Sequence, residues 1–239
     1  MQRSNTYGTA NRLLAALPTH ARQEFLAECD VVDLEFGSVL REAGQRVDYA
    51  YFPMAGIVSL VSRLDDGARI EVGIVGNEGM LGTALVFGME TCTQDLVVQS
   101  LGSAWRIRAS AFSRALAANA ALQRTLNRYT YVLLSQLGQT AACTHFHDVE
   151  SRLARLLLLT RDRAQSNSFF LTHEFIASML GARHAGVTRA ASALRDRRLI
   201  RYSRGDVRVL NSAGLEKASC GCYRRSTRIY ADVFGAPTV

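Results

Sequence analysis

The sequence predicts an α+β protein with a β-rich first half, one long amphipathic helix and a mainly helical second half that ends in a β-hairpin. Three observations support this fold class. Short β-branched and aromatic runs recur between turn residues from residue 31 to 107, apolar residues recur at heptad spacing from 122 to 140, and residues 171–210 carry two helix patterns followed by two alternating strands. The 239 residues are enough for one large domain or two modest ones.

The first half, residues 1–118, is expected to hold one or two short helices within residues 11–28 and then a compact β-roll of the jelly-roll type. Turn residues such as Gly37, Gly44 and Gly67 separate the strand-like runs. The expected strands are Val31–Phe36, Ala50–Phe52, Ile57–Arg63, Ile70–Val75, Leu96–Ser100 and Ala104–Ile107.

A short helix over Ser110–Asn119 and a long one over Ala121–Thr144 are expected to connect the two halves. In the long helix six residues recur at spacings of 4, 3, 4, 3 and 4, the a/d pattern of a coiled coil. Leu134 and Leu137 widen the apolar stripe, so that one side covers the β-roll while the seam meets a partner. We therefore expect residues 119–145 to form a dimerisation helix; the alternative is a monomeric helix that lies on its own core. The expected seam is Leu122, Leu126, Tyr129, Leu133, Gln136 and Thr140.

Residues 171–194 carry the most specific pattern in the chain, two short helices joined by a tight turn. Thr172 is a natural N-cap, Ala177 is small where a second helix must cross, and Gly181 suits the positive φ of the turn. An ordinary helical hairpin in a core is the alternative. It explains less, because Leu199–Leu210 then alternates as two strands around the turn at Gly205. This order predicts a winged helix-turn-helix within residues 146–239, entered by a helix over residues 148–163.

The charge is divided unevenly between the two parts of the chain. Residues 146–239 hold 16 Lys and Arg against 8 Asp and Glu, whereas residues 1–145 hold 12 against 13. Positive charge confined to the part with the helix-turn-helix is the footprint of a nucleic-acid-binding domain. The sequence carries no nucleotide-binding glycine loop and no nucleophile elbow, so an enzyme is not expected.

The whole order resembles the Crp/Fnr superfamily of bacterial transcription regulators, over residues 12–223. Local matches are Tyr51-Phe-Pro53 with Gly56, the glycine-rich segment Gly76–Gly82, and Val149–Leu158 at the entry to the second half. The resemblance implies a sequence-specific DNA-binding regulator that acts as a homodimer on a two-fold operator, with RNA polymerase and an unidentified small effector as further partners. The alternative is an effector-sensing or protein-interaction module whose winged helix docks protein.

The expected recognition helix runs from Arg183 to Arg197, with its first turns in the major groove. Similar family members often show Arg or Val, then Glu, then Arg four residues later; here those positions read His184, Ala185 and Arg189. Arg189 is the expected partner of a guanine, and Ala185 cannot accept a hydrogen bond from cytosine. The expected DNA contacts are Thr172, Arg183, His184, Thr188 and Arg189, with Arg201, Arg204 and Arg208 of the wing on phosphates.

A cyclic nucleotide is not expected as the effector. Family members that bind one place an Arg followed by Ser or Thr on the phosphate, whereas this chain reads Cys92-Thr93 there and has no Lys or Arg between Arg69 and Arg106. The segment Met80–Met89 is apolar instead. It is interpreted either as a pocket for an apolar effector or, preferably, as a core filled by three side chains. The pocket would be lined by Met80, Leu81, Phe87 and Thr93; the filled core would use Met80, Phe87 and Met89.

No cofactor, metal or membrane partner is expected. Cys143, His145 and His147 lie together, but a metal needs three or four converging ligands, so ordinary side chains are the favoured interpretation. Cys220 and Cys222 are interpreted likewise, with a redox switch as the alternative. Three features predict a cytoplasmic location. The five cysteines are scattered, the polar segment Met1–Ala10 does not resemble a signal peptide, and no run of about 18 apolar residues occurs.

Overall fold

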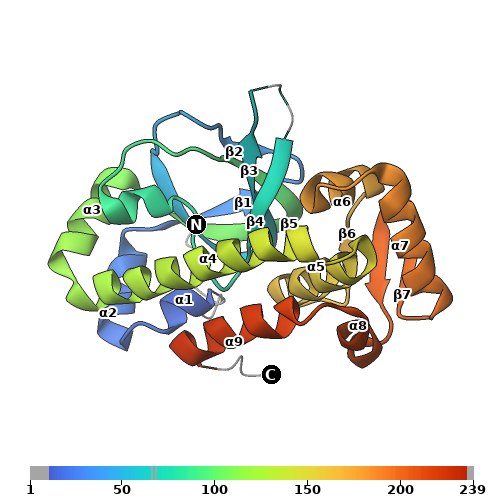
Figure 1. Ribbon diagram of the computed structural model, residues 1–239. Helices are drawn as coiled ribbons and strands as arrows, with labels where there is room; N and C mark the ends of the chain where they lie inside the picture. Colours follow the sequence, from blue (N-terminus) through green and yellow to red (C-terminus); the bar gives the residue numbers. More distant parts are fainter. Residues whose placement is uncertain (1–10, 66, 68, 236–239) are drawn as a thin grey trace.

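The computed structural model describes residues 11–65, 67 and 69–235. The expectation about Met1–Ala10 lies outside these residues. Figure 1 shows the β-rich part on one side, the helix-turn-helix on the other, and the long helix α4 running along the β-rich part toward the helical half. The elements are α1 (Arg12–Ala15), α2 (Thr19–Ala27), β1 (Asp30–Leu34), β2 (Val39–Arg41), β3 (Tyr49–Arg63), β4 (Arg69–Val75), the 3₁₀ helix η1 (Thr83–Phe87), β5 (Asp95–Arg108), α3 (Ala109–Ala118), α4 (Ala120–Phe146), α5 (Val149–Ala164), β6 (Ser168–Phe170), α6 (His173–Leu180), α7 (His184–Asp196), β7 (Ile200–Ser203), β8 (Asp206–Val209), α8 (Ser212–Ala218) and α9 (Cys222–Phe234).

The large sheet is antiparallel in the order β1-β5-β3-β4, with β2 also paired to β5. Its two long strands, β3 and β5, slip register at the bend around Gly56. Gly56 has φ +86°, and a Cβ on Gly102 would lie 2.1 Å from the Ala55 carbonyl oxygen. Only glycine fits this close crossing of two backbones.

The bend corrects two sequence expectations. Ala50–Phe52 and Ile57–Arg63 were predicted as separate strands but form one strand, β3, and Leu96–Ser100 and Ala104–Ile107 are likewise parts of β5. Glycine inside a strand pattern signals a bulge as well as a turn, and here the bulge is what occurs. The short strands β2 and β6 were not predicted, because three residues carry too little periodicity.

Helices α1, α2 and α3 and the first half of α4 pack against the β-roll. Their shared core includes Leu13, Phe25, Phe52 and Phe112, with Phe25 and Phe52 in edge-to-face contact at 5.3 Å. A second core lies in the C-terminal half, where α5 supports α7 and α8. Ile57 and Ile74 of the β-roll join that second core, so the two halves are packed against one another.

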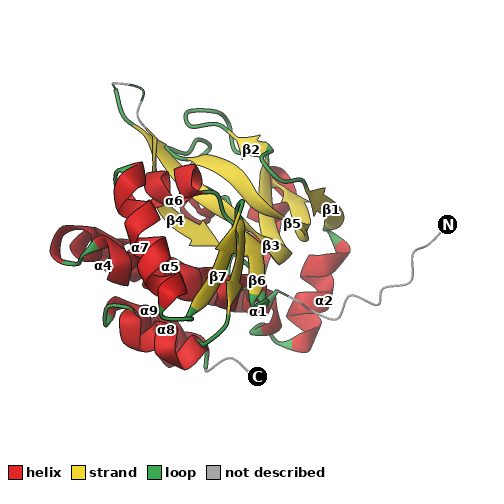
Figure 2. Cartoon of the chain, turned by 90° about the vertical axis from the view of Figure 1, so that its right-hand side faces the viewer, coloured by secondary structure: helices red, strands yellow, loops and turns green. Residues whose placement is uncertain are grey.

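The C-terminal half has the predicted helix, turn, helix and hairpin order. Figure 2 shows its small sheet, ordered β6-β8-β7, in front of the large one with α5, α7 and α8 beside it. The hairpin turns at Arg204 and Gly205, which both have positive φ (50° and 92°) as a two-residue type I′ turn requires. The predicted fold class is confirmed: a β-roll, a long helix and a winged helix-turn-helix.

The structure contradicts the predicted dimer seam on α4. Leu122, Leu126 and Tyr129 are buried in the core that α4 shares with the β-roll, and Leu133 packs against the same core. The two polar members also face their own chain: Gln136 Nε2 donates to the Ser226 carbonyl oxygen at 3.4 Å, and Thr140 accepts from Arg155 at 3.0 Å. The heptad stripe therefore packs against other parts of the same chain. Helix α9 also lies along α4. In the described residues no helix has the length and apolarity needed to span a bilayer.

Candidate DNA-binding interface

The helix-turn-helix is built by local signals in the sequence. The Thr172 hydroxyl caps α6 by accepting from the Phe175 N–H at 3.1 Å, so this residue, predicted as a DNA contact, has a capping role in the structure. Gly181 ends α6 with φ 54°, and α7 begins three residues later at His184. Arg183 at the start of α7 forms no side-chain cap, which leaves the first N–H groups of α7 available to an anion.

The outer face of α7 carries the predicted base contacts. Val187, Ala190, Ala191 and Leu194 face inward, and the structure places the other side of the helix in solvent. The exposed residues of its first turns are Arg183, His184, Ala185, Thr188 and Arg189.

Two of these exposed side chains are tied to α6 and the wing. The His173 ring stacks on Tyr202 at 4.4 Å and meets His184 edge-on at 5.5 Å, while its Nδ1 lies 3.3 Å from the Thr188 hydroxyl. Burial lowers the pKa of His173, and the nearby His184 lowers it further. No local pattern in the sequence points to His173, which contacts His184, Thr188 and the wing residue Tyr202.

The wing presents a pair of like charges. Arg201 of β7 lies directly opposite Arg208 of β8 in the hairpin register, and both are exposed. Like charges at directly opposed positions destabilise a hairpin unless an anion lies between them. Arg204 at the tip of the turn is exposed as well.

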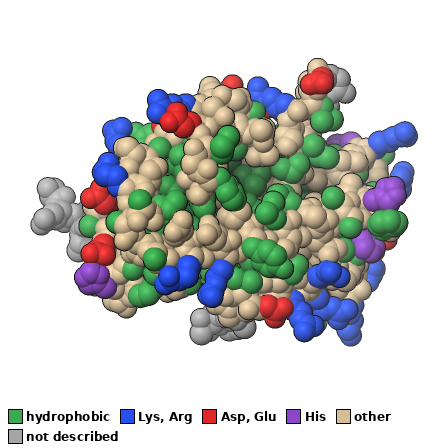
Figure 3. Space-filling view, turned by 60° about the vertical axis from the view of Figure 1, so that its left-hand side comes forward, with side chains coloured by type: hydrophobic (Ala, Val, Ile, Leu, Met, Phe, Trp, Pro, Cys, Tyr) green, Lys and Arg blue, Asp and Glu red, His purple; other side chains and the backbone are tan. Residues whose placement is uncertain are grey.

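Among the described residues, the predicted DNA-contacting arginines have no acidic partner, a property they share with other exposed arginines such as Arg124, Arg128 and Arg224 but not with Arg195 and Arg197 of the same helix-turn-helix. Within the part of the chain that the structure describes, Arg183 and Arg189 of α7 and the three wing arginines form no ion pair. At the far end of α7, by contrast, Arg195 pairs with Asp196 at 3.2 Å and Arg197 with Glu150 at 2.8 Å. Figure 3 shows a group of Lys and Arg side chains at the lower right of this face, with others at the upper left and along the lower edge.

The four residues predicted to line an effector pocket do not converge. Met80 is buried in the core beneath α4, and Leu81 is buried in a separate core inside the β-roll. Phe87 is 63% exposed, and Thr93 is exposed too. The filled-core interpretation fails in part for the same reason, because Met89 is 57% exposed. The apolar run forms η1, a short 3₁₀ helix between Gly82 and Gly88, and this turns Phe87 outward.

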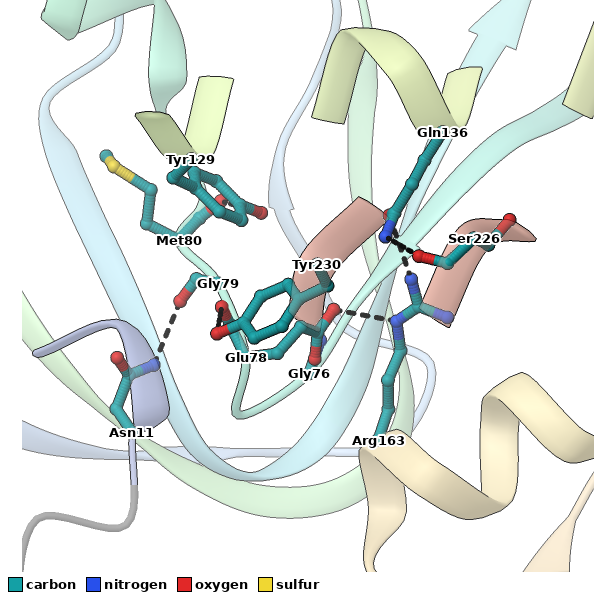
Figure 4. A network of polar contacts seen from close by, with 10 residues as sticks. All are labelled: Asn11, Gly76, Glu78, Gly79, Met80, Tyr129, Gln136, Arg163, Ser226 and Tyr230. Carbon is teal, nitrogen blue, oxygen red and sulfur yellow. Dashed lines mark hydrogen bonds and ion pairs between the residues drawn. The ribbon is translucent and has the colours of Figure 1, made fainter. Parts of the chain in front are cut away.

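Sequence analysis also missed a buried polar network between the glycine-rich segment and the C-terminal half (Figure 4). Arg163 of α5 pairs with Glu78 at 2.7 Å, and the two side chains are only 9% and 11% exposed. The Tyr230 hydroxyl of α9 donates to the Glu78 carbonyl oxygen at 3.0 Å, and Arg163 also donates to Gln136 at 3.3 Å. We call this pair, Glu78 with Arg163, the interdomain latch. Its members lie 85 positions apart in the sequence, so local patterns do not reveal the pair.

The cysteines and histidines near the end of α4 are also arranged differently from the prediction. Cys143, His147, Cys220 and Cys222 come together at one place, although they were interpreted as unconnected side chains. His145 is exposed and lies against Phe146 instead.

Two family models match the chain in the order that the fold shows. The cyclic nucleotide-binding domain matches residues 31–119, and the Crp-like helix-turn-helix domain matches residues 151–218. No curated protein matches the chain.

Solved structures share the fold at low identity. FixK2 from Bradyrhizobium japonicum has a TM-score of 0.69 at 17% identity, over 80% of this chain and 98% of that one. A CRP-family transcriptional regulator from Thermus thermophilus gives 0.67 at 18% identity, over 79% and 96%. The c-di-GMP-responsive regulator CLP of Xanthomonas campestris gives 0.60 at 18% identity, over 80% and 99%. With both domains matched in the right order, the chain belongs to the Crp/Fnr superfamily of bacterial transcription regulators and carries a helix-turn-helix DNA-binding domain.

Proposed function

We propose that this protein is a homodimeric, sequence-specific regulator that reads a two-fold symmetric operator through α7 and binds it without a cyclic nucleotide. The observation that carries the proposal is the unneutralised positive charge of α7 and the wing, above all Arg201 opposite Arg208. A DNA phosphate between these two guanidinium groups replaces their repulsion with charge-assisted hydrogen bonds. A winged helix that docked protein would have no comparable need for this charge.

Arg189 is proposed as the base reader and Arg204 as a phosphate contact. Both are exposed and lack an acidic partner among the described residues, but Arg189 lies in the second turn of α7 and Arg204 at the tip of the wing. A bidentate guanine contact carries sequence information, whereas a phosphate contact carries none. Replacing each arginine should therefore change DNA binding in a different way.

The test is DNA binding by fluorescence anisotropy, on an operator selected from genomic fragments. Arg189→Ala should cost about 1–3 kcal/mol and relax the preference at one base pair. Arg204→Ala should weaken all sequences alike and lower the slope of affinity against salt by about one. Arg195→Ala, which removes an exposed α7 arginine already paired with Asp196, is the matched control and should leave affinity unchanged. If site selection with Arg189→Ala returned the wild-type motif, Arg189 would not be the reader.

The dimer is proposed to form through the outer stripe of α4 in place of the buried seam. Tyr131, Leu134, Gly138 and Ala141 follow one another at spacings of 3, 4 and 3, and all four are exposed. Tyr131 and Leu134 are 64% and 62% exposed, a large apolar surface for one helix. A Cβ on Gly138 would meet nothing within 4 Å, so small residues at this end would let a second helix approach closely.

Independence of cyclic nucleotides is supported by charge and by packing. The stretch between Arg69 and Arg106 offers no cation for a phosphate. Glu78, the acidic residue of the glycine-rich segment, is buried and paired with Arg163. An apolar effector has little support either, because Phe87 and Thr93 lie in solvent instead of lining a common cavity with Met80.

A further inference from the structure

Four side chains with metal-binding atoms meet where α4 ends. Cys143 lies in the last turn of α4, His147 directly follows that helix, and Cys220 and Cys222 flank the start of α9. Their sulfur and ring nitrogen atoms all lie within 4.8 Å of one another. The three cysteines are buried, while His147 is exposed and closes the cluster on the solvent side.

The distances fit a tetrahedral ion. Zn–S bonds of about 2.3 Å and Zn–N bonds of about 2.0–2.1 Å place neighbouring ligand atoms about 3.5–3.8 Å apart at tetrahedral angles. The Cys143 and Cys220 sulfurs are 3.5 Å apart, and the Cys222 sulfur lies 3.6 Å from His147 Nδ1. A sulfur separation of 3.5 Å is far longer than the disulfide bond of about 2.05 Å, so both thiols are free.

Neighbouring groups are of the kind that support a thiolate site. Gln139 Nε2 donates to the Cys222 sulfur at 3.0 Å, the type of outer hydrogen bond that orients a metal ligand. Positive charge is also close, because Arg155 and Arg152 both interact electrostatically with Cys143. Three thiolates around Zn²⁺ leave a net charge of about −1, which these guanidinium groups offset.

We propose that Cys143, His147, Cys220 and Cys222 form a structural Zn²⁺ site. As the ion binds, each of the three thiols releases its proton to solvent and binds as thiolate, while His147 binds as neutral imidazole. A Cys₃His set without an open position is typical of structural zinc. The ion would fasten the start of α9 to the junction between α4 and α5, and so fix the direction in which the DNA-binding half leaves the long helix.

The experiment uses the full chain purified under reducing conditions. Mass spectrometry of the metals should find about one zinc per chain, and Co²⁺ titrated into chelator-stripped protein should give the intense visible absorption of tetrahedral cobalt with an ultraviolet thiolate charge-transfer band. Cys220→Ser and Cys222→Ser should abolish both signals. His147→Ala should lower the affinity for Co²⁺ at least tenfold and alter the visible bands, because water or no ligand replaces the ring. His145→Ala and Cys29→Ser are the matched controls and should behave as wild type.

Several results would overturn the proposal. The first is that the purified protein contains no zinc and gives no tetrahedral cobalt spectrum. The second is that the cobalt spectrum persists in both Cys220→Ser and Cys222→Ser. The third is that Cys143 and Cys220 form a disulfide and no metal is bound. Because His147 is exposed, its alanine variant should fold even if the buried cysteine variants do not. Circular dichroism verifies the folding, and an unchanged Co²⁺ affinity in folded His147→Ala protein would also contradict the site.

Discussion

Removing Arg163 from the interdomain latch should destabilise this protein far more than removing an exposed arginine at a similar ion-pair distance. Arg163→Met keeps the apolar stem but leaves the Glu78 carboxylate buried, with the Gly76 N–H at 3.1 Å as a remaining donor. Breaking a buried pair by deleting one partner costs about 3–5 kcal/mol. For a chain of this size, with a urea m-value of about 3 kcal/mol per M, the midpoint should fall by about 1–2 M.

Glu78→Gln should cost less, about 1–3 kcal/mol, because its amide oxygen can still accept from Arg163. The double variant should cost less than the sum of the single variants, since it contains no isolated carboxylate. The coupling free energy is expected to be about 1–3 kcal/mol. Arg197→Met is the matched control: its pair with Glu150 is 2.8 Å long but exposed, and pairs of that kind contribute less than about 1 kcal/mol.

The assay is urea unfolding at one fixed protein concentration, since dimerisation would make the midpoint concentration-dependent. The fluorescence of Trp105, the single tryptophan, reports on the β-roll, and far-ultraviolet circular dichroism reports mainly on the helices. The reasoning would be refuted if Arg163→Met cost no more than Arg197→Met. It would also be refuted if the two latch variants were additive within about 0.5 kcal/mol.

Three further outcomes are expected. Leu134→Glu on the outer stripe of α4 should give monomers by light scattering, because the partner helix would desolvate the charge. The control, Leu64→Glu at an exposed leucine of the β3–β4 turn, should stay dimeric. A dimeric Leu134→Glu protein would show that the stripe is not the interface. Operator affinity should not change with millimolar cAMP or cGMP, and a saturable tenfold tightening, about 1.4 kcal/mol, would contradict this. Burial raises the pKa of Glu71 to about 8, although the Ser59 hydrogen bond and the charge of Arg163 both act to lower it. Between about pH 4.5 and pH 8, therefore, Glu71 holds a proton in the folded protein but not in the unfolded chain. Relative to Glu71→Gln, the wild type should therefore lose stability progressively as pH rises from about 4.5 to 8; equal differences in melting temperature at pH 5 and pH 8 would contradict a buried, protonated carboxyl.

The helix-turn-helix could be predicted because each of its signals is local. Thr172 caps the first helix, Gly181 makes the turn, and Gly205 makes the wing, all within a few residues of the elements that they define. Arg189 could be placed on the exposed face of α7 for the same reason, since the 3.6-residue period fixes which side the apolar residues occupy.

The side of α4 that the chain leaves exposed could not be predicted from periodicity. The helix carries two stripes at heptad spacing, one starting at Leu122 and the other including Tyr131 and Leu134. Both satisfy the same pattern, and the choice between them depends on the β-roll and on α9, which reaches this helix from about 90 residues away. The more apolar stripe is the one that the chain buries against itself.

The latch and the cysteine cluster escaped prediction because their members are far apart in the chain. Glu78 and Arg163 are separated by 85 residues, and Cys143 and Cys220 by 77. Taken alone, Glu78 and Arg163 have an ordinary interpretation as surface charges, and the cysteines have one as small side chains. Only the docking of the two halves turns them into buried partners, and that docking depends on apolar contacts such as Ile57 and Ile74 meeting the C-terminal core.

Helix α9 connects these features, and its contacts bear on how the protein can be regulated. From its start to its end it meets the cluster at Cys222, the long helix at Ser226 and the latch at Tyr230. An effector that reoriented α7 by opening the latch would have to break the Glu78–Arg163 pair and the Tyr230 hydrogen bond, and water would then hydrate the separated charges. A ligand that reoriented the DNA-binding half would therefore also have to change the contacts of α9 with the cluster, the long helix and the latch.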